Sequence, residues 1–173
     1  MTVAIDTSVL LYILNESTAA PMDPSTGKPV TQCKERVNHL IETLAKAGTT
    51  IIVPTPVLSE MLVRAETAGP AYLQIIDKIK PIRLADFNKR ASVEAAAMTA
   101  QIIKTQGMSV GGDARAKLKF DIMIAAVAKI NGATTIYSDD GGVKKLGEKF
   151  GFSVVGMVDL PLPPEDAQSR LDI

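Results

Sequence analysis

Four acidic side chains stand where carboxylates are unusual in a folded protein. Two follow short apolar runs and two lie inside apolar segments, namely Asp6, Glu60, Asp121 and Asp140. Clustered carboxylates suit hard divalent cations such as Mg²⁺ or Mn²⁺, which prefer oxygen ligands. Such a cation can activate water against a phosphodiester. These acids therefore predict a metal-dependent hydrolase, provided that the fold brings them together.

Two of the acids also have simpler explanations. Asp6, between "VAI" and "TSVLLY", is a candidate helix N-cap, but Thr7 and Ser8 beside it are equally suitable caps. Glu60, in "TPVLSEMLVRA", can pair with Arg64 one helical turn later. A surface pair of this kind contributes only a few tenths of a kcal/mol. Both alternatives stay open for each residue taken alone.

Asp121 is harder to explain as a structural residue. It lies in "LKFDIMIAAVAKI", a segment that is apolar on nearly every side of a helix and is therefore expected to be buried. An ionised carboxylate there costs several kcal/mol unless it has a partner. Lys117, four residues earlier, is a possible partner, but its long flexible chain matches a buried acid poorly.

The segment "TTIYSDDGG" ends a short β-branched and aromatic run with two adjacent aspartates. Capping of the next helix explains one aspartate, and the glycines explain a turn. Asp139 and Asp140 together are one acid more than capping needs. A single metal site accounts for all these acids, whereas the structural alternatives require a separate explanation for each.

Other catalytic sets find little support in the sequence. One histidine, His39, excludes a histidine-rich zinc site, and one cysteine, Cys33, excludes an internal disulfide. No P-loop motif occurs, and the one G-x-S-x-G pattern, "GMSVG" at 107–111, follows an expected helix rather than the strand that a serine nucleophile turn requires. Basic residues near two of the acids are candidates for holding phosphate groups or for a solvated helix face. They are Arg115, Lys117, Lys119, Lys144, Lys145 and Lys149.

Short apolar strands that alternate with helices must position these residues. Strands are expected at 2–5, 49–54, 81–84, 134–137 and 152–157. Helices are expected at 8–14, 34–46, 55–67, 71–80, 87–104, 118–131 and 143–150. Long loops are expected at 15–33 and 105–117. The alternation predicts an α/β fold with a parallel sheet covered on both faces and a functional crevice beyond the carboxyl ends of its strands.

Composition limits the class of protein. The 173 residues, of which 46% are hydrophobic, suit one domain with elaborations, and no run approaches the roughly 20 apolar residues of a membrane span. The lack of a basic leader and the single cysteine predict a cytoplasmic protein. Nineteen basic and nineteen acidic residues cancel, so nucleic-acid binding requires a local patch. Seven aromatic residues and no Trp argue against extended base-stacking platforms.

The motifs "AIDTSVLLY", "PVLSEML" and "FDIMIAAVAKINGATTIYSDD" together resemble PIN-domain ribonucleases, including the VapC toxins of type II toxin–antitoxin systems. The resemblance implies a nuclease domain over residues 1–158, with loop insertions at 15–33 and 105–117, and a tail at 159–173. It also implies a three-layer α/β/α sandwich, often dimeric, that cleaves RNA with Mg²⁺ or Mn²⁺. A separate antitoxin chain would then be a partner.

Carried over by position, the resemblance places the catalytic acids on Asp6, Glu60, Asp121 and Asp140, and makes Asp139 an additional metal ligand. Substrate is expected to bind hydroxyl and basic residues around them, namely Ser138, Thr7, Ser8, Arg115, Lys117 and Lys119. Two alternatives remain: a non-catalytic PIN-like RNA-binding or scaffold module, and a haloacid-dehalogenase-like phosphatase. The phosphatase would need a second acid at the position of Ser8.

Overall fold

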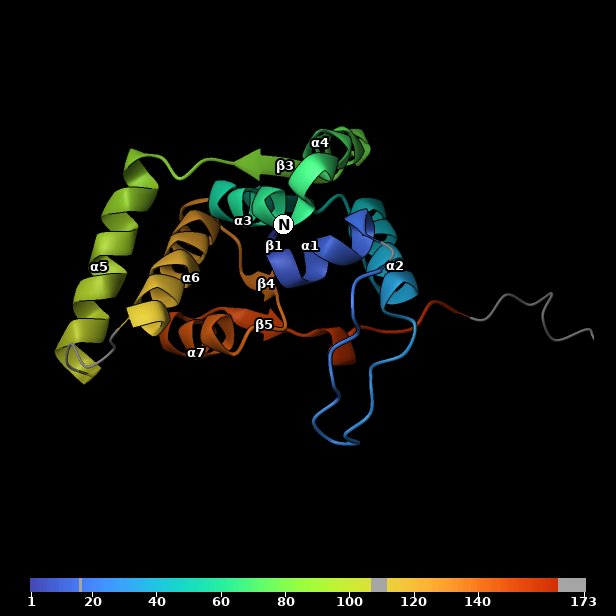
Figure 1. Ribbon diagram of the computed structural model, residues 1–173. Coiled ribbons are helices and arrows are strands. Elements are labelled where there is room, and N and C mark those ends of the chain that lie inside the picture. The colour runs from blue at the N-terminus through green and yellow to red at the C-terminus, as the bar shows by residue number, and fades with distance from the viewer. Residues whose placement is uncertain (16, 107–111, 165–173) are drawn as a thin grey trace, which may run out of the picture.

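A parallel sheet forms the centre of the molecule. The computed structural model describes residues 1–15, 17–106 and 112–164. Its five strands, paired in parallel in the order β3-β2-β1-β4-β5 (Figure 1), are β1 (Thr2–Ile5), β2 (Thr50–Pro54), β3 (Ile82–Ala85), β4 (Thr135–Tyr137) and β5 (Ser153–Val155). The predicted α/β class with a central parallel sheet is confirmed.

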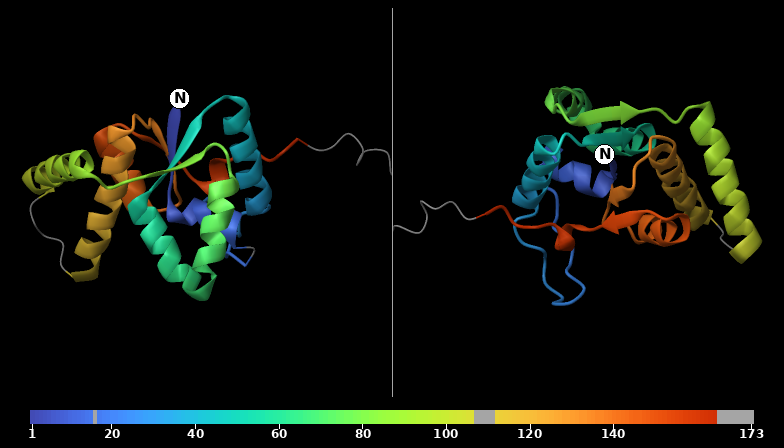
Figure 2. Two further views of the ribbon diagram at one scale, coloured as in Figure 1. Left: turned by 90° about the horizontal axis from the view of Figure 1, so that it is seen from above. Right: turned by 180° about the vertical axis from the view of Figure 1, so that it is seen from behind.

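Helices cover both faces of the sheet. Neighbouring residues of a strand point to opposite faces, so each apolar strand needs helices packed on both sides. In β1, Val3 and Ile5 belong to one apolar cluster, and Ala4 belongs to another. The first cluster also takes residues from α1 (Thr7–Leu14), α2 (Cys33–Lys46), α3 (Thr55–Ala65) and α4 (Gly69–Lys78). The second takes residues from α5 (Lys89–Gln106), α6 (Gly112–Ile130) and α7 (Gly141–Phe150). The result is a three-layer arrangement, seen from two further directions in Figure 2.

The predicted loop at 105–117 is wrong in part, because α5 continues to Gln106 and α6 already begins at Gly112. Glycines near the start of α6 obscured it in the sequence, although the following "ARAKLKFD" consists largely of strong helix formers. Lys117 therefore lies on a helix, one turn before Asp121. Residues 107–111 lie outside the described part of the chain.

The segment predicted as a loop at 15–33 is a loop in its described part up to residue 32, with one antiparallel bridge between Met22 and Pro29, and Cys33 already begins α2. Two 3₁₀ turns complete the described elements, at Glu66–Ala68 and Met157–Asp159. Of the expected tail, residues 165–173 lie outside the described part. No helix within the described ranges is both long and apolar enough to cross a membrane.

The strand order reverses direction at the centre of the sheet. From β1 the chain builds β2 and β3 on one side, and it later returns to build β4 and β5 on the other. The carboxyl ends of β1 and β4 therefore meet at a topological switch point, where parallel α/β sheets have their functional crevice. Asp6 directly follows β1, and Ser138 directly follows β4.

Candidate active site

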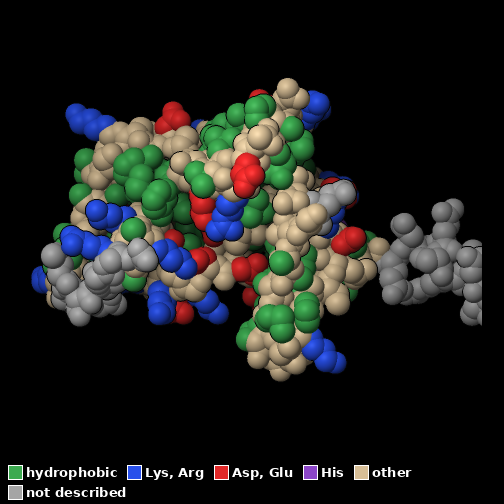
Figure 3. All heavy atoms as spheres, viewed as in Figure 1, with side chains coloured by type: hydrophobic (Ala, Val, Ile, Leu, Met, Phe, Trp, Pro, Cys, Tyr) green, Lys and Arg blue, Asp and Glu red, His purple; other side chains and the backbone are tan. Residues whose placement is uncertain are grey.

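A pocket of about 490 Å³ opens at this switch point and is called the carboxylate pocket below. Its lining includes Asp6 after β1, Glu60 from α3, Asp121 from α6 and Asp140 before α7. Acidic and basic side chains meet in a hollow in the middle of the face shown in Figure 3. The fold thus brings together all four acids predicted as catalytic residues.

Asp6 occupies the N-cap position of α1 without capping the helix through its side chain. Its buried carboxylate instead accepts hydrogen bonds from Ser138 Oγ at 2.6 Å and from Ser8 Oγ at 3.2 Å. Burial raises the pKa of Asp6, the Ser138 hydroxyl opposes this, and the charges of Glu60 and Asp140 raise it further. The capping explanation therefore does not account for this acid.

Asp121 lies on α6 and is only 7% exposed, as its apolar surroundings predicted. Burial raises the pKa of Asp121 to about 6, and the charge of Asp140 adds to this, while the Lys117 ammonium opposes it. Within the described part of the chain, no hydrogen-bond donor is assigned to its carboxylate. This acid therefore lies in a position that disfavours its negative charge.

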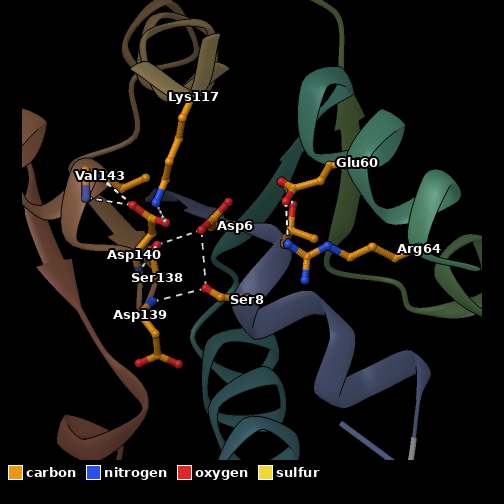
Figure 4. Close-up of polar contacts among 11 residues, drawn as sticks. Asp6, Ser8, Glu60, Arg64, Lys117, Ser138, Asp139, Asp140 and Val143 are labelled. Carbon is orange, nitrogen blue, oxygen red and sulfur yellow. Dashed lines mark hydrogen bonds and ion pairs between the residues drawn. The ribbon is translucent and has the colours of Figure 1, made fainter. Parts of the chain in front are cut away.

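The two carboxylate oxygens of Asp140 have different partners, a helix N-terminus and a lysine (Figure 4). Its Oδ1 caps α7 by accepting from the N–H groups of Gly142 at 2.6 Å and Val143 at 3.4 Å. Its Oδ2 pairs with Lys117 Nζ at 2.7 Å. Burial by itself would raise the pKa of Asp140, but the Lys117 ammonium and the backbone N–H groups together lower it.

Glu60 lies across the pocket from Asp140 in Figure 4. Its Oε2 accepts from Thr7 Oγ1 at 2.7 Å, and its Oε1 pairs with Arg64 Nη2 at 2.7 Å. The pair with Arg64 that sequence spacing suggested is therefore present. It does not remove Glu60 from the site, because both residues line the carboxylate pocket.

Asp139 is not brought into this group, although it was expected to be a metal ligand. Its side chain points away from Asp6 in Figure 4 and does not line the carboxylate pocket. Its Oδ1 accepts from the backbone N–H of Met157 at 2.6 Å. Burial raises the pKa of Asp139, with that N–H opposing and Asp159 adding to the shift. Asp139 therefore holds the turn that follows β5.

The predicted substrate-binding residues divide into two groups. The hydroxyls of Thr7, Ser8 and Ser138 all donate to the acids, so they position carboxylates. Ser138 Oγ also accepts from the Asp140 N–H at 3.0 Å, which links two acids through one hydroxyl.

Among the predicted basic residues, only Lys117 lines the pocket. Arg115 and Lys119 are exposed on α6 and do not line it. Two exposed apolar side chains, Phe120 and Val63, form part of the pocket wall. Sequence reasoning did not single out either of them.

Gly142 is another residue that sequence reasoning missed, because both glycines of "DDGG" were assigned to the turn. A Cβ atom at Gly142 would clash with Oδ2 of Asp121 and would lie 2.9 Å from Oδ1 of Asp140. A Cβ atom at Gly141 would meet nothing within 4 Å. Of these two adjacent glycines, Gly142 is therefore the one without room for a side chain, because the carboxylates of Asp121 and Asp140 lie against it.

The donor set suits a hard divalent cation in its chemistry, since it offers carboxylate oxygens from several elements at one place. Burial and the charges of neighbouring acids raise the pKa values of Asp6 and Asp121, and a cation bound among these acids would offset both effects. Among the described residues, however, no group of three or more His, Cys, Asp or Glu side chains is already arranged to hold a metal ion. The acids therefore fit such an ion by type and place, and the Lys117 ammonium stands among them.

Comparisons with known proteins agree with this architecture. Residues 32–149 match the family model described as the PIN domain, a range that includes Glu60, Asp121 and Asp140. A search of curated proteins finds no match.

The fold is similar to that of three solved structures. VapBC2 from Rickettsia felis, bound to a promoter DNA fragment, has a TM-score of 0.61 at 17% identity, covering 90% of this chain and 98% of that chain. DNA-bound VapBC from Salmonella typhimurium has a TM-score of 0.58 at 16% identity, covering 91% and 98%. VapC20 from Mycobacterium tuberculosis, a toxin described as cleaving the sarcin-ricin loop, has a TM-score of 0.53 at 15% identity, covering 84% and 95%. At these identities the likeness shows the fold alone.

Proposed function

Because the chain belongs to the PIN domain family, we propose that it is an endoribonuclease that depends on Mg²⁺ or Mn²⁺. The observation that carries this proposal is the convergence of four acids, from four separate elements, on one pocket at the switch point of the sheet. Arg64 and Lys117 offset two of these negative charges, and a divalent cation would offset the others and serve phosphodiester hydrolysis.

In this proposal Asp6, Asp121 and Asp140 hold the metal ion. When bound, the ion supplies Lewis acidity and an activated water molecule. Ser138 holds two of these acids next to each other, because its hydroxyl donates to the carboxylate of Asp6 and accepts from the backbone N–H of Asp140. The N-terminal turn of α7 fixes Oδ1 of Asp140 and leaves Oδ2 directed into the pocket.

Glu60 has a different role in the proposal. Thr7 and Arg64 hold its two carboxylate oxygens, so its position is determined from two sides. Glu60 then orients the attacking water, and Lys117 is the pocket residue best placed to contact the phosphate of the substrate. We leave Asp139 out of the metal-ligand set, because its carboxylate is directed elsewhere.

The similar structures support a narrower form of the proposal. Two of them are VapBC structures, and the third is a toxin described as cleaving the sarcin-ricin loop. We accordingly propose single-stranded or structured RNA as the substrate and a separate antitoxin chain as a partner. From the sequence we further propose a homodimer and a cytoplasmic setting.

Cleavage of labelled single-stranded RNA by the purified protein tests the function. We expect cleavage with Mn²⁺ or Mg²⁺, none in excess EDTA, and none by the Asp6→Asn variant. Equal cleavage in EDTA would overturn the metal mechanism. RNA binding without cleavage under any condition would instead favour a non-catalytic module, and cleavage of a chromogenic phosphomonoester alone would favour a phosphatase.

A further inference from the structure

Lys117 reaches into the carboxylate pocket from α6 and ends among the aspartates (Figure 4). Its Nζ lies 2.7 Å from Oδ2 of Asp140. This hydrogen bond and the charge of Asp140 raise the pKa of Lys117, and the charges of Asp121 and Asp6 contribute as well. The ammonium group of Lys117 therefore interacts electrostatically with all three acids that are proposed to hold the metal ion.

The other basic residues near the site do not share this position. Arg64 lines the pocket but pairs with Glu60 on the opposite wall. Arg115 and Lys119, two residues to either side of Lys117, lie outside the pocket lining. Residues two positions apart on a helix do not share a face, so the place of Lys117 is particular to its position on α6.

The contact of Lys117 uses an atom that a metal ion would also need. Oδ1 of Asp140 is engaged by the backbone N–H groups at the start of α7, so Oδ2 is the oxygen left for a cation. The Lys117 ammonium takes that oxygen. A divalent ion on the same oxygen would lie a few ångströms from the ammonium, and the two positive charges would repel strongly.

Lys117 is also able to leave this position. Its side chain is 60% exposed, and a lysine has a flexible four-carbon stem with freely rotating donors. Movement toward solvent would release Oδ2 of Asp140 without disturbing the cap of α7, because the cap uses the other oxygen.

We propose that Lys117 is the internal counter-ion of the carboxylate pocket, and that it exchanges with the divalent metal ion. It neutralises part of the acid cluster in the metal-free protein and withdraws from Asp140 when the metal ion binds. It is then free to contact an RNA phosphate. This inference rests on the proposed metal-dependent function. It adds a competition between the Lys117 ammonium group and the metal ion for Oδ2 of Asp140.

Removing the charge of Lys117 should therefore affect metal and RNA in opposite directions. Calorimetric titration with Mn²⁺ compares wild type, Lys117→Met and, as a matched control on the same helix, Lys119→Met. We expect Lys117→Met to bind Mn²⁺ several-fold more tightly than wild type, because a competing charge is gone. Lys119→Met should bind Mn²⁺ as wild type does. Binding of a labelled RNA, measured by anisotropy with a slowly cleaved phosphorothioate substrate and Mn²⁺, should be weaker for Lys117→Met.

Thermal melts supply a readout that needs neither RNA nor activity. In EDTA, Lys117→Met should melt below wild type, since three acids lose their counter-ion, whereas with saturating Mn²⁺ the two proteins should melt at similar temperatures. Unchanged or weaker Mn²⁺ binding by Lys117→Met, while wild type binds Mn²⁺ and cleaves RNA, would overturn this inference and leave the proposed function intact. Failure of both proteins to bind Mn²⁺ would overturn the inference together with the proposed function.

Discussion

Asp139 and Asp140 are adjacent in the chain, but their side chains serve two different regions. Asp140 faces the carboxylate pocket with Asp6 and Asp121. Asp139 and Asp159 line a neighbouring hollow of about 240 Å³ on the other side of the same turn, called the second hollow below, and Asp140 at the boundary contributes to the lining of both. Both regions contain several acids, and both lie at the carboxyl end of the sheet.

The partners of the acids distinguish the two regions. In the second hollow each aspartate accepts a backbone N–H, Asp139 from Met157 at 2.6 Å and Asp159 from Gly156 at 3.4 Å. In the carboxylate pocket, no hydrogen-bond donor is found for Asp121 among the described residues, and the charges of Asp140, Asp6 and Glu60 act on it. A backbone donor stabilises an acid as part of the fold, whereas an acid that has no such donor and faces three other acids opposes folding and calls for a cation.

The largest expected difference between the regions is in cleavage. Asp121→Asn should reduce RNA cleavage by more than about a hundredfold, because it removes a proposed metal ligand. The metal-free variant should be as stable as wild type or more stable, because one unfavourable charge is gone. Cleavage assays and thermal melts in EDTA and in Mn²⁺ measure both effects.

Asp139→Ala should have the opposite pattern. It leaves the buried N–H of Met157 without its partner, which should destabilise the protein by about 1–3 kcal/mol with or without metal, while Mn²⁺ affinity stays near that of wild type. An Asp121→Asn variant clearly less stable than wild type in EDTA would contradict the contrast. So would an Asp139→Ala variant that loses Mn²⁺ binding.

The second expected effect is a dependence of stability on pH that comes from Asp121. Its pKa is raised from 3.8 to about 6 in the folded protein, so the folded state binds more protons than the unfolded state between these values. The free energy of unfolding of the metal-free protein should therefore fall as the pH rises from about 4 to about 6. The contribution is at most about 3 kcal/mol, since one pKa unit corresponds to about 1.4 kcal/mol.

Urea unfolding in EDTA over this pH range, for wild type and Asp121→Asn, isolates the contribution. The difference in unfolding free energy between the two proteins should grow toward neutral pH, in favour of the variant. A difference that is constant with pH would show that the carboxyl of Asp121 titrates normally and that its surroundings tolerate its charge.

The smallest expected effect separates two adjacent glycines. A methyl group at Gly142 should displace the Asp121 carboxylate, because the end of that side chain can move more easily than the start of α7. We expect Gly142→Ala to lower Mn²⁺ affinity by about tenfold, as is usual for residues that orient metal ligands. Its stability in EDTA should fall slightly, because the added methyl group also crowds Oδ1 of Asp140, which caps α7.

Gly141→Ala is the matched control, because a side chain there meets no other atom within 4 Å. It should keep the Mn²⁺ affinity of wild type and should be equally stable or slightly more stable, since alanine restricts the unfolded chain. Equal Mn²⁺ affinities for the two alanine variants would show that the approach of Asp121 to Gly142 has no role in metal binding.

The sequence by itself determined the architecture and the place of the site. Apolar strands that alternate with helices require burial on both faces, which predicts a parallel sheet, and parallel strands have their carboxyl ends at one edge. Asp6 and Asp140 follow two such strands, so their meeting was predictable from local pattern alone. The assignment of Asp121 to the site was also predictable, because a charge in so apolar a segment is too costly unless it has a partner.

Only the tertiary structure decided which member of each neighbouring pair faces the pocket. Asp140 enters it and Asp139 does not, Lys117 enters it and Lys119 does not, and Gly142 rather than Gly141 lies against Asp121. Members of a pair share their residue type and nearly the same chain position, so propensity and periodicity treat them alike. Their roles depend on contacts with segments far away in the chain, such as Met157 for Asp139 and α6 for Asp140. Those contacts exist only once the layers have packed.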